Sequence, residues 1–342
     1  MQKISFIRRI LRNKATTLLI ILVVMAVYTM IVSSGVLEDQ PFSAIFTRGF
    51  MASGNLLSTF YNLVMQTLMM CGLAIIIMGG GIDLSVGGQA ALGSMLFALI
   101  CSKTDIPWGF VLLICIGIAI CFGLANTLLV NGLRFPAFIA TIGMSSIYSG
   151  FCNVMTNGFN ININRQNLID LVNTKVFGVF PVTFLFAVFL VIVYQYILSR
   201  TTFGRSIYMA GGNSHAARLS GLNPNRIRMI LFLNNALLAV LGGIIYAAQV
   251  KFASATAIIS TTPDMKAISA AVLGGVSFMG GSGNLGGPFV ALLLLNMFDN
   301  MLKILGVMPY WNIFLQGFLL AVALIIDFIS EERRRRAMLA GK

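Results

Sequence analysis

Charged residues are scarce in this chain. Only 10% of its 342 residues are Asp, Glu, Lys or Arg, whereas a soluble globular domain carries about 25%. Hydrophobic residues make up 58% of the chain, and the mean hydropathy is +0.92. This composition excludes an ordinary soluble protein. The long uncharged runs indicate helical membrane spans, and the alternating strands of a membrane barrel are absent.

Residues that commonly carry chemistry are also few. The sequence holds one histidine, His215, and five cysteines without a C-x-x-C pair, so neither a metal site nor a redox site is expected. No G-x-x-x-x-G-K-[ST] motif occurs, so the chain is not expected to cradle nucleotide phosphates itself. No paired acid and base supports an enzyme. We therefore expect no catalytic residue, no metal and no cofactor in this chain.

Acidic residues are outnumbered, with 10 Asp and Glu against 23 Lys and Arg, which gives a net charge of +13. Nucleic-acid-binding proteins show the same excess. Here, however, most basic residues lie in short segments beside apolar runs, where the orientation of membrane spans places them. We expect contact with membrane lipid and no nucleic-acid partner.

The apolar runs predict an all-α polytopic membrane protein with about ten transmembrane helices in a single domain, 1–342. The first run follows a basic head, as in a cleaved signal peptide, but it is longer than the usual apolar core of such a peptide. Basic residues concentrate in 1–14, in 199–228 and at the C-terminal end, which favours a cytoplasmic location for both termini. The expected spans are about 15–32, 59–78, 88–101, 108–130, 137–155, 180–198, 229–250, 267–279, 289–305 and 309–326.

A glycine-rich break interrupts the second apolar stretch at 79–88. It contains Asp83, the only charged residue between 49 and 102. A carboxylate at membrane depth costs about 2.5–3.5 kcal/mol on insertion scales, and non-helical backbone there must be buried in protein or line a water-filled cavity. We expect two spans to meet at this break, with Asp83 or Ser85 capping the second one. The candidate hinge or translocation-path residues are Gly81, Asp83, Ser85 and Gly87.

A second break, 280–288, divides a run that is too long for one ordinary span. A pair of interrupted apolar segments is a pointer to a transport site, and both breaks are expected on the same side of the membrane. Beyond the second break, Asn296, Asp299 and Asn300 share one helical face. We expect them to line a polar path, the alternative being that Asp299 is merely solvated near the outer interface.

The segment 199–228 holds five arginines and no acid. Asn213 or Ser214 is predicted to cap a short helix that ends at Gly221. The helix would present a small apolar face, with Ala216 and Ala217, for insertion into a groove on a partner; the alternative is an ordinary basic loop. The candidate coupling residues are Gly204, Arg205, Gly212, Asn213, Ala216, Ala217, Arg218, Ser220 and Gly221.

These motifs resemble those of one family. The segment Gly81-Ile82-Asp83-Leu84-Ser85-Val86-Gly87 is similar to the signature of permease subunits of bacterial simple-sugar ABC importers, the ribose, galactose and autoinducer-2 type. The resemblance continues through 135–144, 202–222, 271–275 and 283–287. It covers about 15–327, and the motifs occur in order.

The resemblance implies a ten-helix permease fold of the vitamin B12 importer type in the bacterial inner membrane. The permease would pair with a second copy or a homologue. Two separate ATPase domains would bind ATP and magnesium, and a periplasmic or lipid-anchored binding protein would deliver the solute. Asp83 would act as a structural cap or hinge, or contact the sugar directly. The alternative function is an ion- or proton-coupled secondary transporter, which also uses broken helices but usually needs buried ionisable relays.

Overall fold

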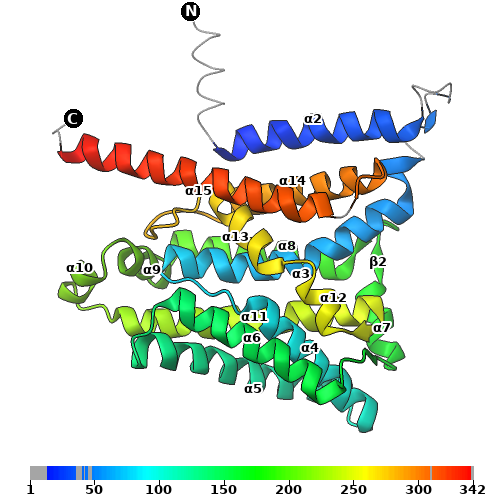
Figure 1. Ribbon diagram of the computed structural model, residues 1–342, viewed down its shortest axis with the longest axis horizontal. Helices are drawn as coiled ribbons and strands as arrows, with labels where there is room; N and C mark the ends of the chain where they lie inside the picture. The colour runs from blue at the N-terminus through cyan, green and yellow to red at the C-terminus, as the bar shows by residue number, and fades with distance from the viewer. Residues whose placement is uncertain (1–13, 36–40, 42, 45–47, 309, 340–342) are drawn as a thin grey trace, which may run out of the picture.

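The computed structural model describes residues 14–35, 41, 43–44, 48–308 and 310–339. The expected basic head therefore lies almost wholly outside the described residues. Long helices run side by side across the molecule (Figure 1). Their bounds are α2 Lys14–Ser34, α3 Ser53–Met78, α4 Val86–Lys103, α5 Trp108–Thr127, α6 Ala137–Thr156, α8 Val182–Arg200, α11 Pro224–Val250, α13 Pro263–Leu273, α14 Gly286–Ile304 and α15 Tyr310–Leu339.

Shorter elements connect these helices. Two are irregular turns of helix, the 3₁₀ segment η3 and the π-helical segment η4, and four strands of two residues form two antiparallel pairs, β1 with β4 and β2 with β3. The sequence did not predict these strands. Their bounds and those of the short helices are η3 Gly49–Met51, η4 Leu128–Gly132, β1 Ile161–Asn162, α7 Gln166–Asn173, β2 Lys175–Val176, β3 Phe180–Pro181, α9 Thr202–Gly212, α10 Ser214–Leu219, β4 Phe252–Ala253 and α12 Ala255–Ile259.

The all-α polytopic class is confirmed. Within the described residues, eight helices are long and apolar enough to cross a membrane. They correspond to eight of the ten expected spans. The expected span at 267–279 is α13, which has only 11 residues, and the expected span at 309–326 lies in α15, where the apolar stretch Ile313–Val322 is short. The first residue of that tenth span, Pro309, is outside the described residues.

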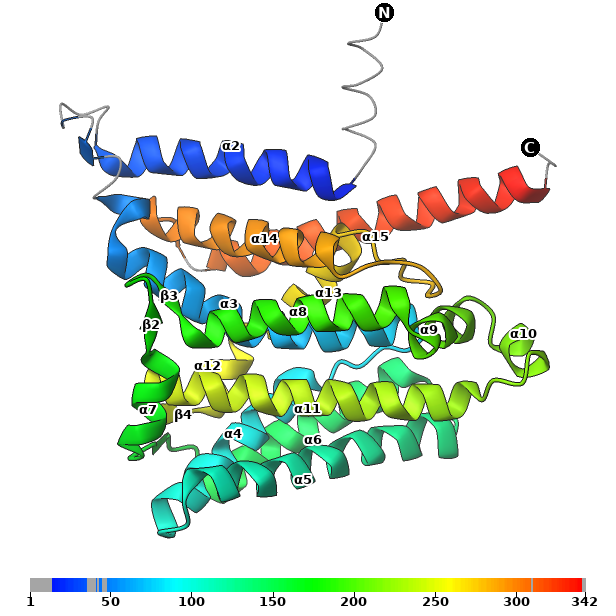
Figure 2. The same cartoon turned by 180° about the vertical axis from the view of Figure 1, so that it is seen from behind.

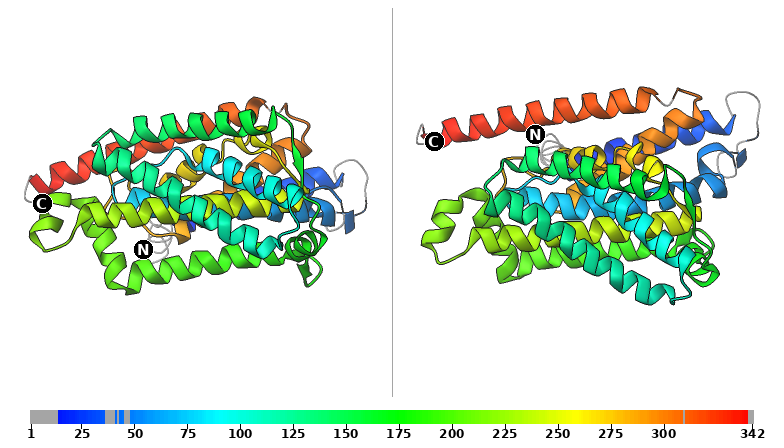
Figure 3. Two further views of the ribbon diagram at one scale, coloured as in Figure 1. Left: turned by 90° about the horizontal axis from the view of Figure 1, so that it is seen from below. Right: turned by 60° about the horizontal axis from the view of Figure 1, so that its bottom comes forward.

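The molecule has two distinct ends. Helices α9 and α10 project from one end, whereas α7 and the β2–β3 pair lie at the other (Figures 1 and 2). Helix α15 ends on the α9–α10 side, and α10 extends beyond the bundle (Figure 3). The order in which the helices run between the two ends agrees with an even number of passes.

Helices α3 and α11 form the centre of the bundle. Each packs against several long helices: α3 contacts α13, α14 and α8, and α11 contacts α3, α4 and α5. The spanning window of α3 is 83% buried, whereas those of α5 and α6 are 22% buried. Exposed apolar side chains such as Ile139 and Val154 cover the outer face of α6. In a protein of this composition, such apolar faces contact lipid.

The two ends predict the outcome of a labelling experiment. Asn164→Cys, beside the β1–β4 pair, and Ser214→Cys, at the start of α10, introduce thiols at exposed positions of opposite ends. In intact and inverted vesicles, a membrane-impermeant maleimide should label the two variants from opposite sides. Labelling of both from the same side would contradict the fold as a transmembrane arrangement.

Candidate functional site

The two glycine breaks and the end of α9 meet backbone to backbone. The N–H of Gly281 donates to the carbonyl oxygen of Met78 over 2.9 Å. A Cβ atom added at Gly211 would lie 2.0 Å from that same oxygen, and one added at Gly280 would lie 3.1 Å from the Cα of Gly80. We call this contact of 78–81, 211–212 and 280–283 the glycine junction. The expectation that both breaks lie on one side is confirmed, and they are in direct contact.

Backbone conformation adds a second reason for glycine at the junction. Gly80, Gly280 and Gly281 have φ angles of 75°, 83° and 74°, a region that side-chain-bearing residues rarely occupy. Close by, the hydroxyl of Tyr208 on α9 donates to the carbonyl of Gly283 over 2.9 Å. Burial raises the pKa of Tyr208, so this hydroxyl keeps its proton. Helix α9 is therefore attached to the second break by a side-chain bond as well as by backbone contact.

The two ends of the second break lie in contact with each other. A Cβ atom at Gly287, in the first turn of α14, would lie 1.9 Å from the carbonyl oxygen of Gly274 at the end of α13. The side chain of Asn284 accepts from the N–H of Gly287, and the N–H of Leu285 donates to Oε1 of Gln195 on α8. The segment 275–285 thus leaves the bundle, reaches the glycine junction and comes back. The sequence located this break but not its contact with Gln195.

Asp83 lies just past the junction and is fully buried, with 0% of its surface exposed. Its Oδ1 accepts from the backbone N–H and the hydroxyl of Ser85, at 2.9 and 2.5 Å. Its Oδ2 accepts from Nδ2 of Asn235 on α11 at 2.9 Å. Nδ2 of Asn126 on α5 lies 3.2 to 3.3 Å from both carboxylate oxygens. The carboxylate therefore ties the start of α4 to α5 and α11.

Both amides are oriented as donors. Asn126 and Asn235 direct their N–H groups to Asp83, and their own carbonyl oxygens are buried without a hydrogen-bond partner. Every donor around the carboxylate comes from a neutral group. Asp83 accepts from the N–H of Ser85, the residue at the N-cap position of α4, and its role as a cap or hinge stays a prediction. The side chain of Ser85 does not cap the helix, because its hydroxyl donates to Asp83 and accepts from Gln89 and Asn126.

The neighbouring candidates pack around this carboxylate. A Cβ atom at Gly81 would lie 3.1 Å from Cγ1 of Ile76, and one at Gly87 would lie 3.5 Å from Cγ of Pro263 at the start of α13. Thr141 on α6 accepts from the N–H of Leu84 through its hydroxyl, at 3.0 Å. The sequence did not single out Asn126, Asn235 and Thr141 as partners of the segment around Asp83. The first two were visible only as polar residues within expected spans.

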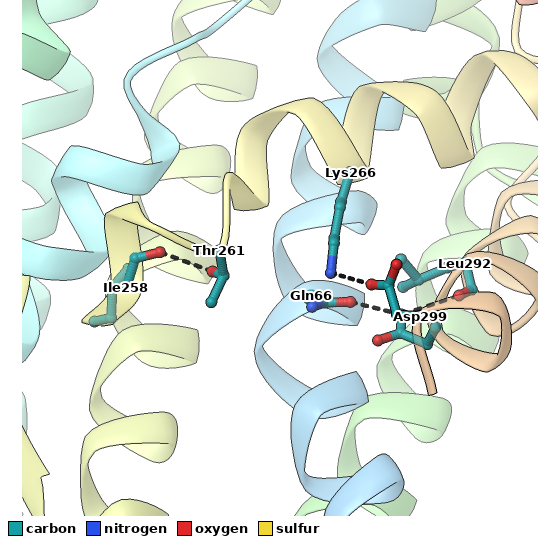
Figure 4. Close-up of polar contacts among 7 residues, drawn as sticks. Gln66, Ile258, Thr261, Lys266, Leu292 and Asp299 are labelled. Atoms are coloured by element: carbon teal, nitrogen blue, oxygen red, sulfur yellow. Dashed lines mark hydrogen bonds and ion pairs between the residues drawn. The ribbon is translucent and has the colours of Figure 1, made fainter. Parts of the chain in front are cut away.

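The predicted polar face of α14 exists, but it packs against other helices. Asn296 donates to Oε1 of Gln66 on α3, and Asn300 exchanges hydrogen bonds with Asn55, also on α3. Asp299 forms an ion pair with Lys266 of α13, at 2.5 Å (Figure 4). Asp299 is only 7% exposed, so the alternative of a merely solvated carboxylate is wrong. The sequence placed Lys266 in an outer loop and missed this pair, although a buried carboxylate near a basic residue is the signal for one.

These polar groups surround a cavity of about 70 Å³, lined in part by Thr59, Gln66, Lys266, Asn296 and Asp299. At roughly 30 Å³ of liquid volume per water, the space admits about two water molecules. It is too small for a sugar. The face is therefore a polar contact between α3, α13 and α14 in this conformation, and its role in a solute path stays a prediction.

The short helix predicted at Asn213 is α10. Oδ1 of Asn213 accepts from the N–H groups of His215 and Ala216, at 3.0 Å each. Gly221 follows the helix with φ at 81°, and the N–H of Leu222 returns to the carbonyl of Ala217. Ser220 donates its hydroxyl to the carbonyl of Ala216. The predicted start and end of this helix are confirmed.

One face of α10 differs from the prediction. Ala217 is buried, with 1% of its surface exposed, because it packs inward against the chain itself. Ala216 and Arg218 are exposed, and Leu219 is 81% exposed. The face available to a partner is therefore built from Ala216 and Leu219, and Ala217 does not belong to it. The sequence showed the spacing but not which side of so short a helix packs inward.

Helix α9 connects this exposed tip to the junction. Thr201 caps α9 by accepting from the N–H of Gly204. A Cβ atom at Gly204 would lie 2.4 Å from the carbonyl oxygens of Ile197 and Leu198, so glycine permits the sharp turn from α8. Arg205 is exposed. Gly212 ends α9 at the junction, which places α10, α9 and both breaks in one continuous series of contacts.

The fold and these contacts define a polytopic helical permease with two broken spans. The family described as the permease component of branched-chain amino acid transport systems matches residues 55–324. This is most of the chain, so the protein belongs to that family.

Curated relatives narrow the comparison within the family. The chain is 34% identical to the ribose import permease protein RbsC of Escherichia coli (strain K12) over 286 residues, which is 79% of this chain and 86% of the relative. It is also 34% identical to the autoinducer 2 import system permease protein LsrC of Enterobacter sp. (strain 638), over 76% of this chain and 75% of the relative. The resemblance to permeases of simple-sugar ABC importers is confirmed. The chain is thus a multi-pass permease of the inner membrane.

The junction predicts a sharp difference between two adjacent glycines. Gly211→Ala would place a methyl group 2.0 Å from the Met78 oxygen, whereas Gly212→Ala would place one at an ordinary 3.6 Å from the Cα of Gly281. Overpacking of this kind costs about 1–3 kcal/mol. Gly211→Ala should lower the thermal unfolding temperature in detergent, and Gly212→Ala should not. Equal stability of the two variants would contradict the close backbone contact.

The Asp83 network predicts a graded response. Asp83→Leu leaves the amides of Asn126 and Asn235 without their buried acceptor, at a cost of about 1–3 kcal/mol for each unsatisfied donor. Asp83→Asn should be milder, because the Asn235 amide can turn over and offer its unpartnered oxygen to the new N–H. Thermal unfolding should rank wild type above Asp83→Asn and Asp83→Leu lowest. If both variants unfold like wild type but abolish transport, the carboxylate acts in transport through its charge.

Proposed function

We propose that this chain is the translocation subunit of an ATP-driven importer for a simple sugar or a related small polar solute. The α9–α10 end faces the cytoplasm and receives a separate ATPase, which binds the ATP and magnesium. The α7 end faces a soluble or lipid-anchored binding protein that delivers the solute. A second copy or a homologue completes the path. The relatives' printed functions, ribose import and autoinducer 2 import, support this substrate class.

One observation carries the coupling part of the proposal. The exposed helix α10 is continuous with α9, and the end of α9 touches both broken spans at the glycine junction. A push on α10 would therefore reach 79–85, which leads to α4, and 280–285, which leads to α14. Because Gly80, Gly211 and Gly280 carry no side chain, their backbones are in direct contact, and a displacement of α9 would be passed to both breaks. An ATPase that moves α10 would thereby act, through α9, on both broken spans.

The proposed orientation of the chain in the membrane is inferred from the distribution of its basic residues. The segments at the α9–α10 end carry Arg134, Arg200, Arg205, Arg218 and Arg226, and excess basic residues mark the cytoplasmic side of short loops. Both termini are then cytoplasmic. The exposed surface of α10 includes an apolar side chain, Leu219, at 81% exposure. A groove on a docked partner would bury it.

A secondary transporter is the competing function. The described spans contain a buried ion pair, Lys266 with Asp299, and a buried carboxylate, Asp83. Both are fully engaged with fixed partners across helices, which suits structural roles better than a proton relay. The family membership also favours the importer. Uptake that persists after the partner ATPase is disabled would favour ion or proton coupling instead.

The exposed face of α10 gives the direct test. Ala216→Glu and Leu219→Glu place a carboxylate on the proposed docking face, where a buried apolar anchor is typically worth about 2 kcal/mol or more. Each should weaken ATPase association at least about tenfold and reduce solute-stimulated ATP hydrolysis in vesicles that contain permease, ATPase and binding protein. Thermal unfolding of the permease alone should be unchanged.

Two further variants serve as controls. Leu171→Glu makes the same change at a half-exposed site on α7, at the opposite end, and should leave ATPase association intact. Ala217→Glu buries a charge within the chain and should lower the stability of the permease itself. Wild-type uptake and hydrolysis in both Ala216→Glu and Leu219→Glu would remove α10 as the coupling element.

A further inference from the structure

A large basic cavity lies at the α9–α10 end, beside the glycine junction, whose Gly80 and Gly81 form part of its lining. Its volume is about 970 Å³, and its walls come from η4, the start of α6, α10 and the start of α11. Three arginines line it: Arg134, Arg218 and Arg228. Among the described residues that line it there is no aspartate or glutamate. The cavity therefore concentrates positive charge without an internal counter-charge.

The arginines are not neutralised by the chain. Within the described part of the structure, none of the three forms an ion pair. Nη1 of Arg228 lies 3.3 Å from Oδ1 of Asn131, and its Nε is buried with no hydrogen-bond partner. A buried guanidinium N–H without an acceptor is costly. An anion in the cavity would supply that acceptor.

Hydrogen bonds between the elements that line the cavity fix its walls. Nδ2 of Asn131 donates to the carbonyl of Asn225 at 3.0 Å, which ties η4 to the first turn of α11. Arg134 has φ at 59°, a conformation that non-glycine residues rarely adopt and that the surrounding structure must hold. Helices α6 and α11 both begin at the cavity, with Ala137 and Pro224 in its lining, and helix N-termini favour negative charge.

An apolar groove adjoins this cavity. It has a volume of about 620 Å³ and lies between α5 and α11, lined by Leu124, Leu128 and Met229 among others. It shares Asn131, Asn223 and Asn225 with the basic cavity. Leu124 and Leu128 are 45% and 61% exposed, on the side of the bundle where apolar faces meet the membrane. A basic cavity at the end of a span thus continues into an apolar groove along the span.

We propose that the two form one binding site for an anionic phospholipid. The headgroup phosphate occupies the cavity among Arg134, Arg218 and Arg228, and an acyl chain lies in the groove between α5 and α11. Basic pockets between spans on the cytoplasmic side bind anionic headgroups, and guanidinium groups suit phosphate oxygens geometrically. The groove distinguishes a lipid from a free phosphate, which has no apolar part.

A lipid bound in this cavity would affect the proposed coupling, because the cavity lies between α10 and the spans. Arg218 belongs to α10, whereas Arg134 and Arg228 belong to the bundle. A phosphate bound to all three would connect the exposed helix to the spans. The binding site itself does not depend on which solute is imported, nor on whether an ATPase docks at α10, so its test is separate from that of the proposed function.

The test uses the full-length chain, purified in detergent and stripped of lipid. It is titrated with phosphatidylglycerol or phosphatidylcholine, and bound lipid and thermal unfolding are measured by native mass spectrometry and by a melting assay. Wild type should bind phosphatidylglycerol preferentially and melt at a higher temperature with it. Arg134→Gln/Arg218→Gln changes two exposed side chains, so folding is preserved. Each lost arginine should weaken phosphatidylglycerol binding about fivefold.

Arg200→Gln/Arg205→Gln is the matched control, because it removes the same charge from exposed positions at the same end but outside the cavity. It should keep the wild-type preference. Equal loss of binding in this control and in the cavity variant would show a diffuse charge effect and overturn the proposal. Stabilisation by inorganic phosphate equal to that by phosphatidylglycerol would assign the cavity to a soluble anion and overturn the lipid site. Leu128→Gln, in the groove, should weaken lipid binding but leave any effect of inorganic phosphate unchanged.

Discussion

The hydrogen bond from the N–H of Gly281 to the carbonyl of Met78 closes a contact on which much of the architecture depends. It joins the end of α3, the central helix, to a loop that has left the bundle between α13 and α14. Gly211 sits against the same carbonyl, so α9 is part of the contact. Three backbones can approach this closely because a Cβ atom is absent at Gly211, Gly280 and Gly281. The glycines are therefore required by the contact between segments far apart in the sequence, in addition to the turns each one makes.

Asp83 complements the junction a few residues further along. The junction allows backbones to approach closely, whereas the carboxylate fixes the start of α4 by hydrogen bonds to α5 and α11. Charge burial of this kind is unfavourable unless every lone pair finds a donor, and the described contacts supply those donors. The break thus combines glycines in close backbone contact with a carboxylate held by hydrogen bonds from two other helices. Hinge function for the glycines and a positioning role for Asp83 stay predictions.

The sequence predicted features that local pattern determines. Apolar length located the spans, the glycine runs located both breaks, and Asn213 with Gly221 located α10. The sequence did not predict features that depend on which face of a helix packs against its neighbours. Ala217 and Ala216 are adjacent small residues, and only packing decides that Ala217 is the buried one. Lys266 precedes a long uncharged run and was placed in a loop, because sequence does not show that α13 starts deep enough to reach Asp299. The short strands carry too few residues to produce a periodic signal.

Within the described residues, the buried polar groups around Asp83 and Asp299 form hydrogen bonds and an ion pair with one another, and they do not line an open path. Asp83 accepts from two amides and from Ser85, whereas Lys266, Asp299, Gln66 and Asn296 contact one another around a space of about 70 Å³. Both clusters are formed within one chain, and the space in the second cluster is too small for a sugar. A hydrated solute must therefore pass either through a conformation in which the contacts of α14 with α3 and α13 open, or along a surface completed by a second permease chain. Because α14 begins at the second break, any motion at the glycine junction would act first on the helix that carries Asn296, Asp299 and Asn300. Helix α14 thus links the glycine junction to the polar face.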